Sequence, residues 1–469
     1  MPNSFRTHFA TILTLFRIWL PIGMTLVVLS PLSIPLFADA PARNTPRPNI
    51  ILIMADDLGY ECLGANGGTS YPTPHLDQLA AGGARFEYCY SQPLCTPTRV
   101  QLMTGIYNVR NYDHFGVLPK DQTTFGNLLR DAGYKTCIVG KWQLGHDFAL
   151  PEHFGFDEHC LWQLTRRPER YRNPGLEING KEIDYTGGEY GPDIVNDYAI
   201  DYVTRMKAEP FFLYYPMILT HSPFPPTPDS PDWNGKVATA AGGKKGRKGA
   251  KAQGDGNHFD DMVTYMDKLV GKLVTRLDTL KIRERTLVIF LGDNGTGRGL
   301  TSMMGERRVV GGKGNTDQSG MHVPLIVSMP GTIQAGQVRR DLVDTTDFLP
   351  TLCAAAGVDV SSRLEIDGRS FWPQLRGESG TPREWIYSWY AKDGGQKAAA
   401  EFARDHDYKL YRDGRFFSVA AGDLDRAPLD VEKLDDAAAA SKRKLQAALD
   451  RYTVARPAKF VKQSPSKAE

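Results

Sequence analysis

Short, continuously apolar runs recur along the chain and alternate with stretches whose apolar residues have helical spacing. Such runs are typical of strands buried on both faces of a parallel sheet. Helices are predicted over Thr123–Ala132, which ends just before Gly133, and over Phe259–Leu280, which carries charges on its other face. The alternation predicts an α/β fold with a large, mostly parallel central sheet flanked by helices. The predicted strands are Asn49–Ala55, Lys135–Val139, Phe211–Tyr215, Thr286–Leu291 and Val323–Ser328.

The pattern changes after about residue 360, where the apolar runs become shorter and richer in aromatic residues. The runs Trp385–Tyr390, Tyr408–Tyr411 and Phe416–Val419 predict a smaller antiparallel sheet. A polar, lysine-rich tail follows them. We therefore predict a main α/β domain over residues 41–360, and a C-terminal subdomain with its tail over residues 361–469.

The N-terminal segment has the pattern of an export signal. Basic residues precede an apolar run, Ile18–Leu29, and small residues follow it up to Ala38-Asp39-Ala40. The run is short for a membrane span and is broken by Pro21. Residues 1–40 are therefore predicted to be a cleaved signal peptide, with an uncleaved anchor as the alternative. No later segment is apolar enough to cross a membrane, so a periplasmic or secreted protein is predicted.

Residues 236–257 interrupt the pattern with glycine, alanine and six basic residues. This segment has too little apolar surface to be buried, so a flexible loop is predicted; a patch that attracts polyanions is the alternative. Over the whole chain of 469 residues the formal net charge is only +2, and no nucleic-acid-binding motif is found. The composition therefore excludes nucleic acid as the expected partner.

Polar residues that can bind ions follow four of the predicted strands. The carboxyl ends of parallel strands meet at one edge of a sheet, which is where sites form in open α/β folds. Two adjacent carboxylates, together with a carboxylate and an amide, suit a hard cation such as Ca2+ or Mg2+. Helix capping and turns are the alternative use of such residues. The residues are Asp56 and Asp57 after the first strand, Lys141 after the second, His221 after the third, and Asp293 and Asn294 after the fourth.

A helix is predicted to begin near Cys95, because Pro97 suits a first helical turn, and to continue to about Thr104. The N-terminus of a helix favours anions, which predicts a lowered pKa and a reactive cysteine. Arg99 lies one turn further on the same side. A buried structural cysteine is the alternative. The other five cysteines show no zinc-ligand spacing, and their pairing stays open.

The motif C-x-P-x-R at residues 95–99, followed by QLMTG, resembles the signature of the formylglycine-dependent sulfatases of the alkaline-phosphatase-like superfamily. Five further segments resemble motifs of that family and occur in its order between about Arg47 and Gly331. They are NIILIMADDLG and TLVIFLGDNG, which resemble its two metal-binding strands; GKWQLG, which resembles G-K-W-H-L-G; THSPF, which resembles the loop of its catalytic histidine; and GGKGNTDQSGMHVPLIVSMPG, which resembles its final lysine segment.

This resemblance implies a role for each candidate residue. Cys95 would be oxidised to formylglycine by a maturation enzyme and hydrated to a geminal diol, one oxygen of which attacks sulfur. His221 would protonate the leaving alcohol oxygen as a general acid, helped by Lys313. One Ca2+ per chain would be bound by Asp56, Asp57, Asp293, Asn294 and residue 95. The charge on the sulfate and diol oxygens would be offset by this ion and by Arg99, Lys141 and Lys313.

The chain departs from the family pattern at Gln143, which stands where G-K-W-H-L-G has a histidine. A histidine there is thought to help deprotonate the second diol oxygen or to hold the sulfate. Glutamine can donate and accept hydrogen bonds but takes no proton near neutral pH. Either Gln143 positions the diol while another group is the base, or turnover is slow. We hypothesise that His146, three residues further on, is that base.

Together the motifs predict a calcium-dependent sulfatase that hydrolyses sulfate esters, with sulfated carbohydrate as the expected substrate. The carbohydrate part rests on the predicted export and on analogy within the fold. One alternative is a phosphodiesterase or phosphonate hydrolase of the same superfamily. The other is a degenerate sulfatase homologue that binds anionic glycans without turnover, for which Gln143 is the only support.

Overall fold

The structure is a computed structural model that describes residues 47–234, 258–360, 362–395, 399–419, 424–425 and 427–461. The predicted signal peptide, residues 1–40, and the predicted basic loop, residues 236–257, lie outside the described residues. Within these ranges no helix has the length and apolar character needed to cross a membrane.

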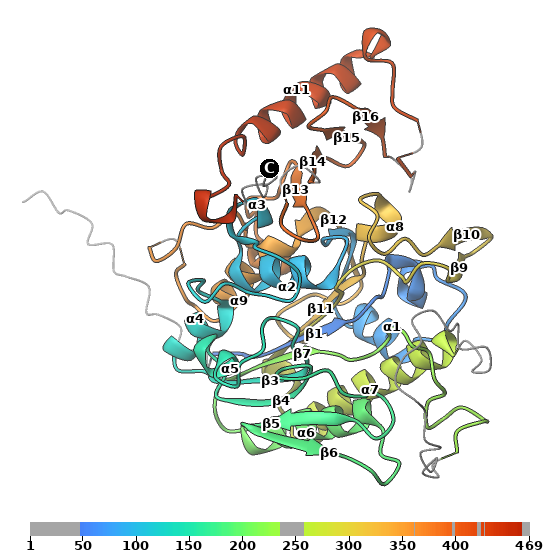
Figure 1. Cartoon of the computed structure of the whole chain (residues 1–469), viewed down its shortest axis with the longest axis vertical. Helices are drawn as coiled ribbons and strands as arrows, with labels where there is room; N and C mark the ends of the chain where they lie inside the picture. Colours follow the sequence, from blue (N-terminus) through green and yellow to red (C-terminus); the bar gives the residue numbers. More distant parts are fainter. Residues whose placement is uncertain are drawn as a thin grey trace, which may run out of the picture. The chain divides into compact units, whose positions relative to one another are not determined.

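Ten strands form one mixed sheet in the order β12-β2-β11-β8-β1-β7-β3-β4-β5-β6 (Figure 1). The central neighbours from β8 to β4 are all parallel, so their carboxyl ends lie at one edge. The predicted α/β class, with a large sheet between helices, is thereby confirmed. The strands are β1 (Asn49–Ala55), β2 (Ala84–Tyr90), β3 (Lys135–Lys141), β4 (Glu158–Trp162), β5 (Gly175–Ile178), β6 (Lys181–Asp184), β7 (Phe211–Pro216), β8 (Thr286–Gly292), β11 (Leu325–Ser328) and β12 (Gln337–Asp344).

The direction predicted for one strand of the sheet is wrong. The apolar run Val323–Ser328 was expected in the parallel set, but the strand in it, β11, is antiparallel to both of its neighbours, β8 and β2. An apolar run predicts burial on both faces of a sheet and carries no information on direction. The carboxyl end of β11 therefore lies away from the edge where β1, β3, β7 and β8 end.

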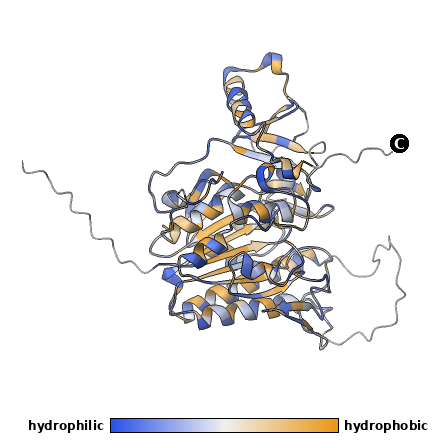
Figure 2. Cartoon of the chain, turned by 60° about the vertical axis from the view of Figure 1, so that its left-hand side comes forward, coloured by the Kyte–Doolittle hydropathy of each residue, from blue (hydrophilic) through white to orange (hydrophobic). Residues whose placement is uncertain are grey.

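The surroundings of the central strand β1 explain why the predicted strands are continuous apolar runs in the sequence. All seven of its residues are buried, because β7 and β8 pair on its two sides and helices cover both faces. Ile50, Leu52 and Met54 belong to one apolar cluster, and Ile51 and Ile53 to the other. The apolar strands accordingly lie in the middle of the molecule, between helices with polar outer surfaces (Figure 2).

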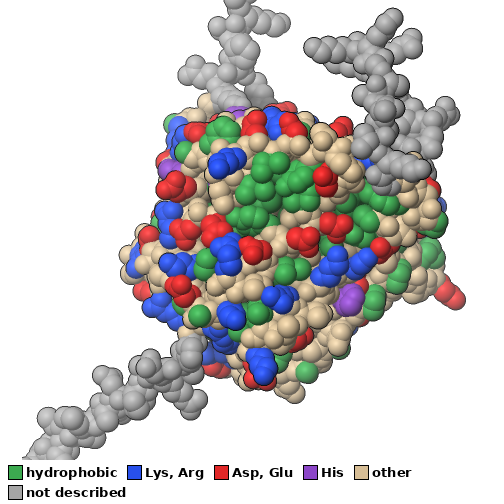
Figure 3. All heavy atoms as spheres, turned by 90° about the horizontal axis from the view of Figure 1, so that it is seen from below, with side chains coloured by type: hydrophobic (Ala, Val, Ile, Leu, Met, Phe, Trp, Pro, Cys, Tyr) green, Lys and Arg blue, Asp and Glu red, His purple; other side chains and the backbone are tan. Residues whose placement is uncertain are grey.

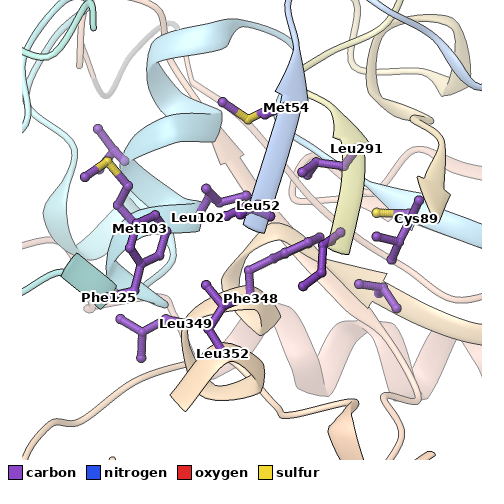
Figure 4. Packing of buried hydrophobic residues seen from close by; sticks show 14 of the residues in the cluster. Leu52, Met54, Cys89, Leu102, Met103, Phe125, Leu291, Phe348, Leu349 and Leu352 are labelled. Atoms are coloured by element: carbon purple, nitrogen blue, oxygen red, sulfur yellow. The ribbon is translucent and has the colours of Figure 1, made fainter. Parts of the chain in front are cut away.

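Helices pack on each face of the sheet in a way that places the N-terminus of α2 near its carboxyl edge. On the α2 side, Leu102 and Phe348 pack against Leu52 and Leu291 (Figure 4). The predicted helix Thr123–Ala132 is α4, with Thr124 as its N-cap. Helices α1 (Pro74–Ala81), α6 (Gly191–Arg205) and α7 (Phe259–Thr279) cover one face; α2 (Cys95–Thr104), α4 (Phe125–Asp131) and α9 (Phe348–Ala355) cover the other. Shorter elements are α3 (Asn108–Asn111), α5 (Leu150–His153), α8 (Gln318–Met321), α10 (Trp372–Leu375), β9 (Thr301–Met304) and β10 (Arg307–Val310).

The predicted small antiparallel sheet is present after residue 360. Its strands follow one another in the order β13-β14-β15-β16, and α11 (Asp436–Asp450) packs on β14 and β15. This helix lies in what was predicted as a polar tail. It was missed because its sequence is dominated by alanine and charged residues, which leave few large apolar residues to show the helical spacing. The strands are β13 (Ile386–Tyr390), β14 (Ala400–Arg404), β15 (Tyr408–Tyr411) and β16 (Phe416–Ser418). The domain boundary at residue 360 stays a prediction.

The small sheet contacts the loop between β10 and α8. The Lys409 ammonium donates to the carbonyl of Thr316 and to Asp425 Oδ2, 2.6 Å away. The Tyr411 hydroxyl lies 2.8 Å from the Thr316 hydroxyl. Thr316 is three residues from Lys313, so β15 helps to fix the loop that carries this lysine.

The surface has no dominant charge on the face shown in Figure 3, where acidic and basic side chains are interspersed around an apolar patch. This distribution agrees with the small net charge of the chain. On this face the described side chains form no continuous basic surface.

Candidate active site

The carboxyl edge of the parallel strands brings the predicted site residues together. Asp56 follows β1, Lys141 ends β3 and Asp293 follows β8, and the register pairs β1 directly with β8. Asp57 accepts a hydrogen bond from Asn294 Nδ2 at 2.8 Å, and its own amide donates to Asp293 Oδ1 at 3.0 Å. These contacts join residues more than 230 positions apart in the chain.

The oxygen atoms of this edge are arranged for a cation. Single ligand atoms of Asp56, Asp293 and Cys95 lie within 4.8 Å of one another, and all three residues are buried. Asn294 Oδ1 is buried and has no hydrogen-bond partner in the described part of the chain. A buried carbonyl oxygen without a donor is costly, and a bound cation would satisfy it. Asp57 adopts φ 63°, a backbone conformation that is strained for aspartate and is often found at functional sites.

The buried carboxylates interact unfavourably with one another. Burial and the negative charge of Asp56 raise the pKa of Asp293 to about 7. Burial also acts to raise the pKa of Asp56, but the charges of Lys141 and the neighbouring cations outweigh it and hold this pKa well below its usual range. Three carboxylates with a free amide oxygen in one buried cluster form a donor set that fits a hard divalent cation.

Three cations surround the acidic cluster, and each pairs with a different carboxylate. Lys141 Nζ lies 2.9 and 2.8 Å from the two oxygens of Asp56. The remaining two pairs are Arg99 Nη2 with Asp293 Oδ2 at 3.1 Å and Lys313 Nζ with Asp57 Oδ1 at 2.6 Å. The charge of Asp57 outweighs burial and raises the pKa of Lys313. Arg99 also donates to the carbonyl of Lys141 at 3.0 Å, which links α2 to the end of β3.

Cys95 is the first residue of α2, as predicted, and only 1% of its surface is exposed. The predicted lowering of its pKa is wrong. Burial raises the pKa of the thiol, and the nearby acids Asp293 and Asp56 add to this, against the opposing charge of Lys141. The helix N-terminus is therefore too weak to make Cys95 a thiolate. All six cysteines lie in the described ranges, and all are buried and unpaired.

His221 follows β7 and directs one ring nitrogen toward the acidic cluster. Its Nδ1 donates to the carbonyl of Ser222 at 2.6 Å, which leaves Nε2 facing Asp57 Oδ2 at 3.8 Å. Burial lowers the pKa of His221, although the charges of Asp56 and Asp57 oppose this. The Tyr171 hydroxyl donates to the carbonyl of His221 and so fixes the backbone at this point.

Two glutamines follow the ends of the paired strands β3 and β4. Gln143 and Gln163 have φ values of 56° and 63°, and their Oε1 atoms are both buried with no partner among the residues described. The Trp142 amide donates to the carbonyl of Trp162 at 3.0 Å, which holds the two segments together. Gln143 stands in a motif visible in the sequence, whereas Gln163 follows β4, which was not predicted.

Comparison with known proteins agrees with this site. The family model described as Sulfatase matches residues 48–358, and the model described as N-sulphoglucosamine sulphohydrolase, C-terminal, matches residues 313–453. The fold and the site thus define a hydrolase of sulfuric esters. The chain belongs to the sulfatase family, which confirms the predicted class of enzyme.

Individual relatives and a solved structure are similar to this chain over most of its length. The chain is 33% identical to arylsulfatase A of Bos taurus over 388 residues, which covers 73% of this chain and 71% of the relative. It is 32% identical to N-acetylgalactosamine-6-sulfatase of Canis lupus familiaris over 384 residues, covering 74% and 69%. The crystal structure of Ps i-CgsB superposes with a TM-score of 0.71 at 26% identity, covering 88% of this chain and 94% of that one.

Proposed function

We propose that the protein hydrolyses sulfate esters of sulfated carbohydrates, using a formylglycine made from Cys95 and one bound Ca2+. The observation that carries this proposal is the buried cluster of Asp56, Asp293 and the unpartnered Asn294 Oδ1 around Cys95. The carbohydrate substrate is supported by relatives named for it, among them N-acetylgalactosamine-6-sulfatase and, at 26% identity, the N-acetylglucosamine-6-O-sulfatase of Bacteroides thetaiotaomicron. Release of sulfate from a panel of sulfated sugars tests it; activity on simple aryl sulfates alone would remove the carbohydrate part.

Export and maturation belong to the same proposal. The N-terminal sequence pattern supports a signal peptide over residues 1–40 and hence a periplasmic or secreted enzyme. The motif C-x-P-x-R at residues 95–99, which resembles the signature of the formylglycine-dependent sulfatases, supports Cys95 as the precursor of the nucleophile. A maturation enzyme that oxidises Cys95 is therefore a required partner of the chain.

Asp56, Asp57, Asp293 and Asn294 would hold the cation, together with an oxygen of residue 95. When bound, Ca2+ would supply positive charge beside the sulfate, and the hydrated formylglycine would supply the nucleophilic oxygen. Carboxylates engaged by the cation would release Lys141, Arg99 and Lys313 from their present ion pairs. These side chains could then donate to sulfate oxygens, where fixed positive charges stabilise the developing negative charge.

His221 is placed to hold a proton for the leaving oxygen, because Nδ1 is occupied by Ser222 and Nε2 faces the cluster. We expect His221→Gln to lower kcat about 10²- to 10⁴-fold on sugar sulfates, whose alkoxide leaving groups need protonation. The loss should be much smaller on 4-nitrophenyl sulfate, whose phenolate leaves without a proton. Steady-state kinetics on both substrates measures the difference.

A matched control for this variant is His153→Gln, since His153 lies on the short helix α5, where its ring contacts the carbonyl of Lys120 and the ring of Phe154. Its rates on both substrates should stay within about 2-fold of wild type. An equal loss on sugar and aryl sulfates in His221→Gln would remove the role as general acid.

His146 is poorly placed for the base role considered above. It is exposed, and its Nδ1 lies 3.1 Å from the carbonyl of Leu164. The ring would have to leave this contact to take a proton from residue 95. We therefore expect His146→Ala to leave kcat and its pH profile unchanged, with Gln143 orienting the diol as an amide. Loss of one limb of the pH profile in His146→Ala would instead support the original hypothesis.

A further inference from the structure

The segment that follows β4 forms one side of the active site. Trp162 ends β4 beside Lys141, and its indole Nε1 donates to the carbonyl of Pro168 at 3.0 Å. The next turn of chain therefore folds back over the indole. Tyr171 continues the segment and donates to the carbonyl of His221. The segment is thus fixed at both ends by site elements, with Arg170 between these two anchors.

Arg170 is a buried cation that shares its counterion, Asp56, with the closer Lys141. Only 8% of its side chain is exposed, yet Nη1 has no hydrogen-bond partner among the described residues. The nearest carboxylate oxygen is Asp56 Oδ2 at 3.9 Å, and both oxygens of Asp56 already accept from Lys141. A buried guanidinium with an unpaired N–H is costly, so Nη1 calls for an acceptor that the described residues do not supply.

The orientation of Arg170 is set by Trp162. The guanidinium carbon lies 4.0 Å from the centre of the Trp162 ring, so one face of the group is covered. Its N–H groups can then bind only in the guanidinium plane. That geometry suits the oxygens of a sulfate or a carboxylate.

The charges of the site agree with an anionic ligand at Arg170. Each of the three carboxylates, Asp56, Asp57 and Asp293, has one close cation in Lys141, Lys313 and Arg99. Arg170 is a fourth cation, in excess of the carboxylates. A divalent cation in the cluster would only enlarge this excess.

We propose that Arg170 is a substrate-contacting residue that binds an anionic oxygen of the sulfated sugar; this inference rests on the sulfatase function proposed above. The oxygen can come from the scissile sulfate or from a second acidic group on the same substrate. The sequence pointed to residues 161–191 as one place where substrate selectivity could lie, but it gave no reason to choose Arg170 within that range.

The test compares wild type with Arg170→Gln and Arg170→Lys on three substrates: 4-nitrophenyl sulfate, a monosulfated amino sugar, and the same amino sugar with a second sulfate. We expect kcat/KM to fall about 10- to 100-fold in Arg170→Gln, the usual effect of losing a hydrogen bond to a charged group, and less in Arg170→Lys. A similar loss on all three substrates assigns Arg170 to the scissile sulfate. A loss confined to the disulfated sugar assigns it to the second group.

The control is Arg166→Gln, which removes the same charge from the same segment, at a partly exposed arginine already paired with Glu182 and Asp184. Its kinetics should match wild type on all three substrates. Unchanged kcat/KM in Arg170→Gln, with only a lower Tm or weaker Ca2+ binding, would overturn the proposal and leave Arg170 as a support for Asp56.

Binding of the disulfated sugar by isothermal titration calorimetry separates this inference from the proposed function. If wild type released no sulfate from any substrate, the sulfatase function would fail. Weaker binding of the sugar to both Arg170 variants than to wild type and to Arg166→Gln would still support the inference. Equal binding to all four proteins would reject it.

Discussion

Replacing Cys95 by alanine lowers kcat/KM for sulfate-ester hydrolysis by about 10⁴-fold or more, because a site built around one covalent nucleophile loses nearly all its chemistry with it. The fold should survive, since the change removes one sulfur atom from the start of α2 and leaves the ion pairs of Lys141 and Arg99 in place. Sulfate release is measured on purified protein after coexpression with a formylglycine-generating system, with circular dichroism to check the fold.

The matched control is Cys89→Ala, which removes an equally buried and unpaired thiol from β2. It should lose stability by about 1 kcal/mol, as for a small core truncation, and keep its activity. Mass spectrometry of the peptide that carries residue 95 gives a second measurement. Active wild-type enzyme with unmodified cysteine at position 95, or an active Cys95→Ala variant, would contradict the formylglycine mechanism.

Removing divalent cations with EDTA should abolish turnover and lower Tm, and added Ca2+ should restore both. The reason is that Asp56, Asp57 and Asp293 are buried close together, so a cation that binds the folded site stabilises it. A site with one ion should gain about 2.7 kcal/mol in the free energy of unfolding when Ca2+ is at 100 times its Kd. Chemical denaturation with and without Ca2+ measures this increment, and a parallel series with Mg2+ shows which ion is preferred.

Asp293→Asn should lose most of the Ca2+-dependent increment and most of the activity. The increment is compared rather than the absolute stability, because the variant also weakens the buried pair with Arg99. Asp267→Asn is the control: Asp267 is a buried carboxylate outside the site that accepts hydrogen bonds from the amides of His75 and Leu76. An increment that is the same in Asp293→Asn, Asp267→Asn and wild type would place the ion elsewhere.

Much of the site was predictable because its residues follow strands that are buried on both faces. The apolar composition of a run such as Asn49–Ala55 is enough to predict a buried strand. In a parallel sheet the residue that follows such a strand lies at the carboxyl edge. Asp56, Lys141 and Asp293 could therefore be grouped, and their motifs connected to the sulfatases, before any coordinates were known.

The remaining features depend on contacts that are distant in the chain. The direction of β11 is set by its neighbours β8 and β2, which its own residues do not specify. Arg170 becomes a candidate only because Trp162 and Asp56 surround it. The pKa of Cys95 was mispredicted for the same reason: helix position is a local property, whereas burial and the charge of Asp293 depend on the whole fold.

The burial of Cys95 would set a time limit on its proposed modification. A side chain that is 1% exposed in the folded protein is out of reach of another enzyme's active site. Asp293, which pairs with Arg99 in the folded site, is synthesised by the ribosome about 200 residues after Cys95. At ribosomal speeds of 5–20 residues per second this is an interval of about 10 to 40 s. Under the proposed formylglycine mechanism, maturation would thus compete with folding, and a chain that folded before it was oxidised would keep a thiol in place of its nucleophile.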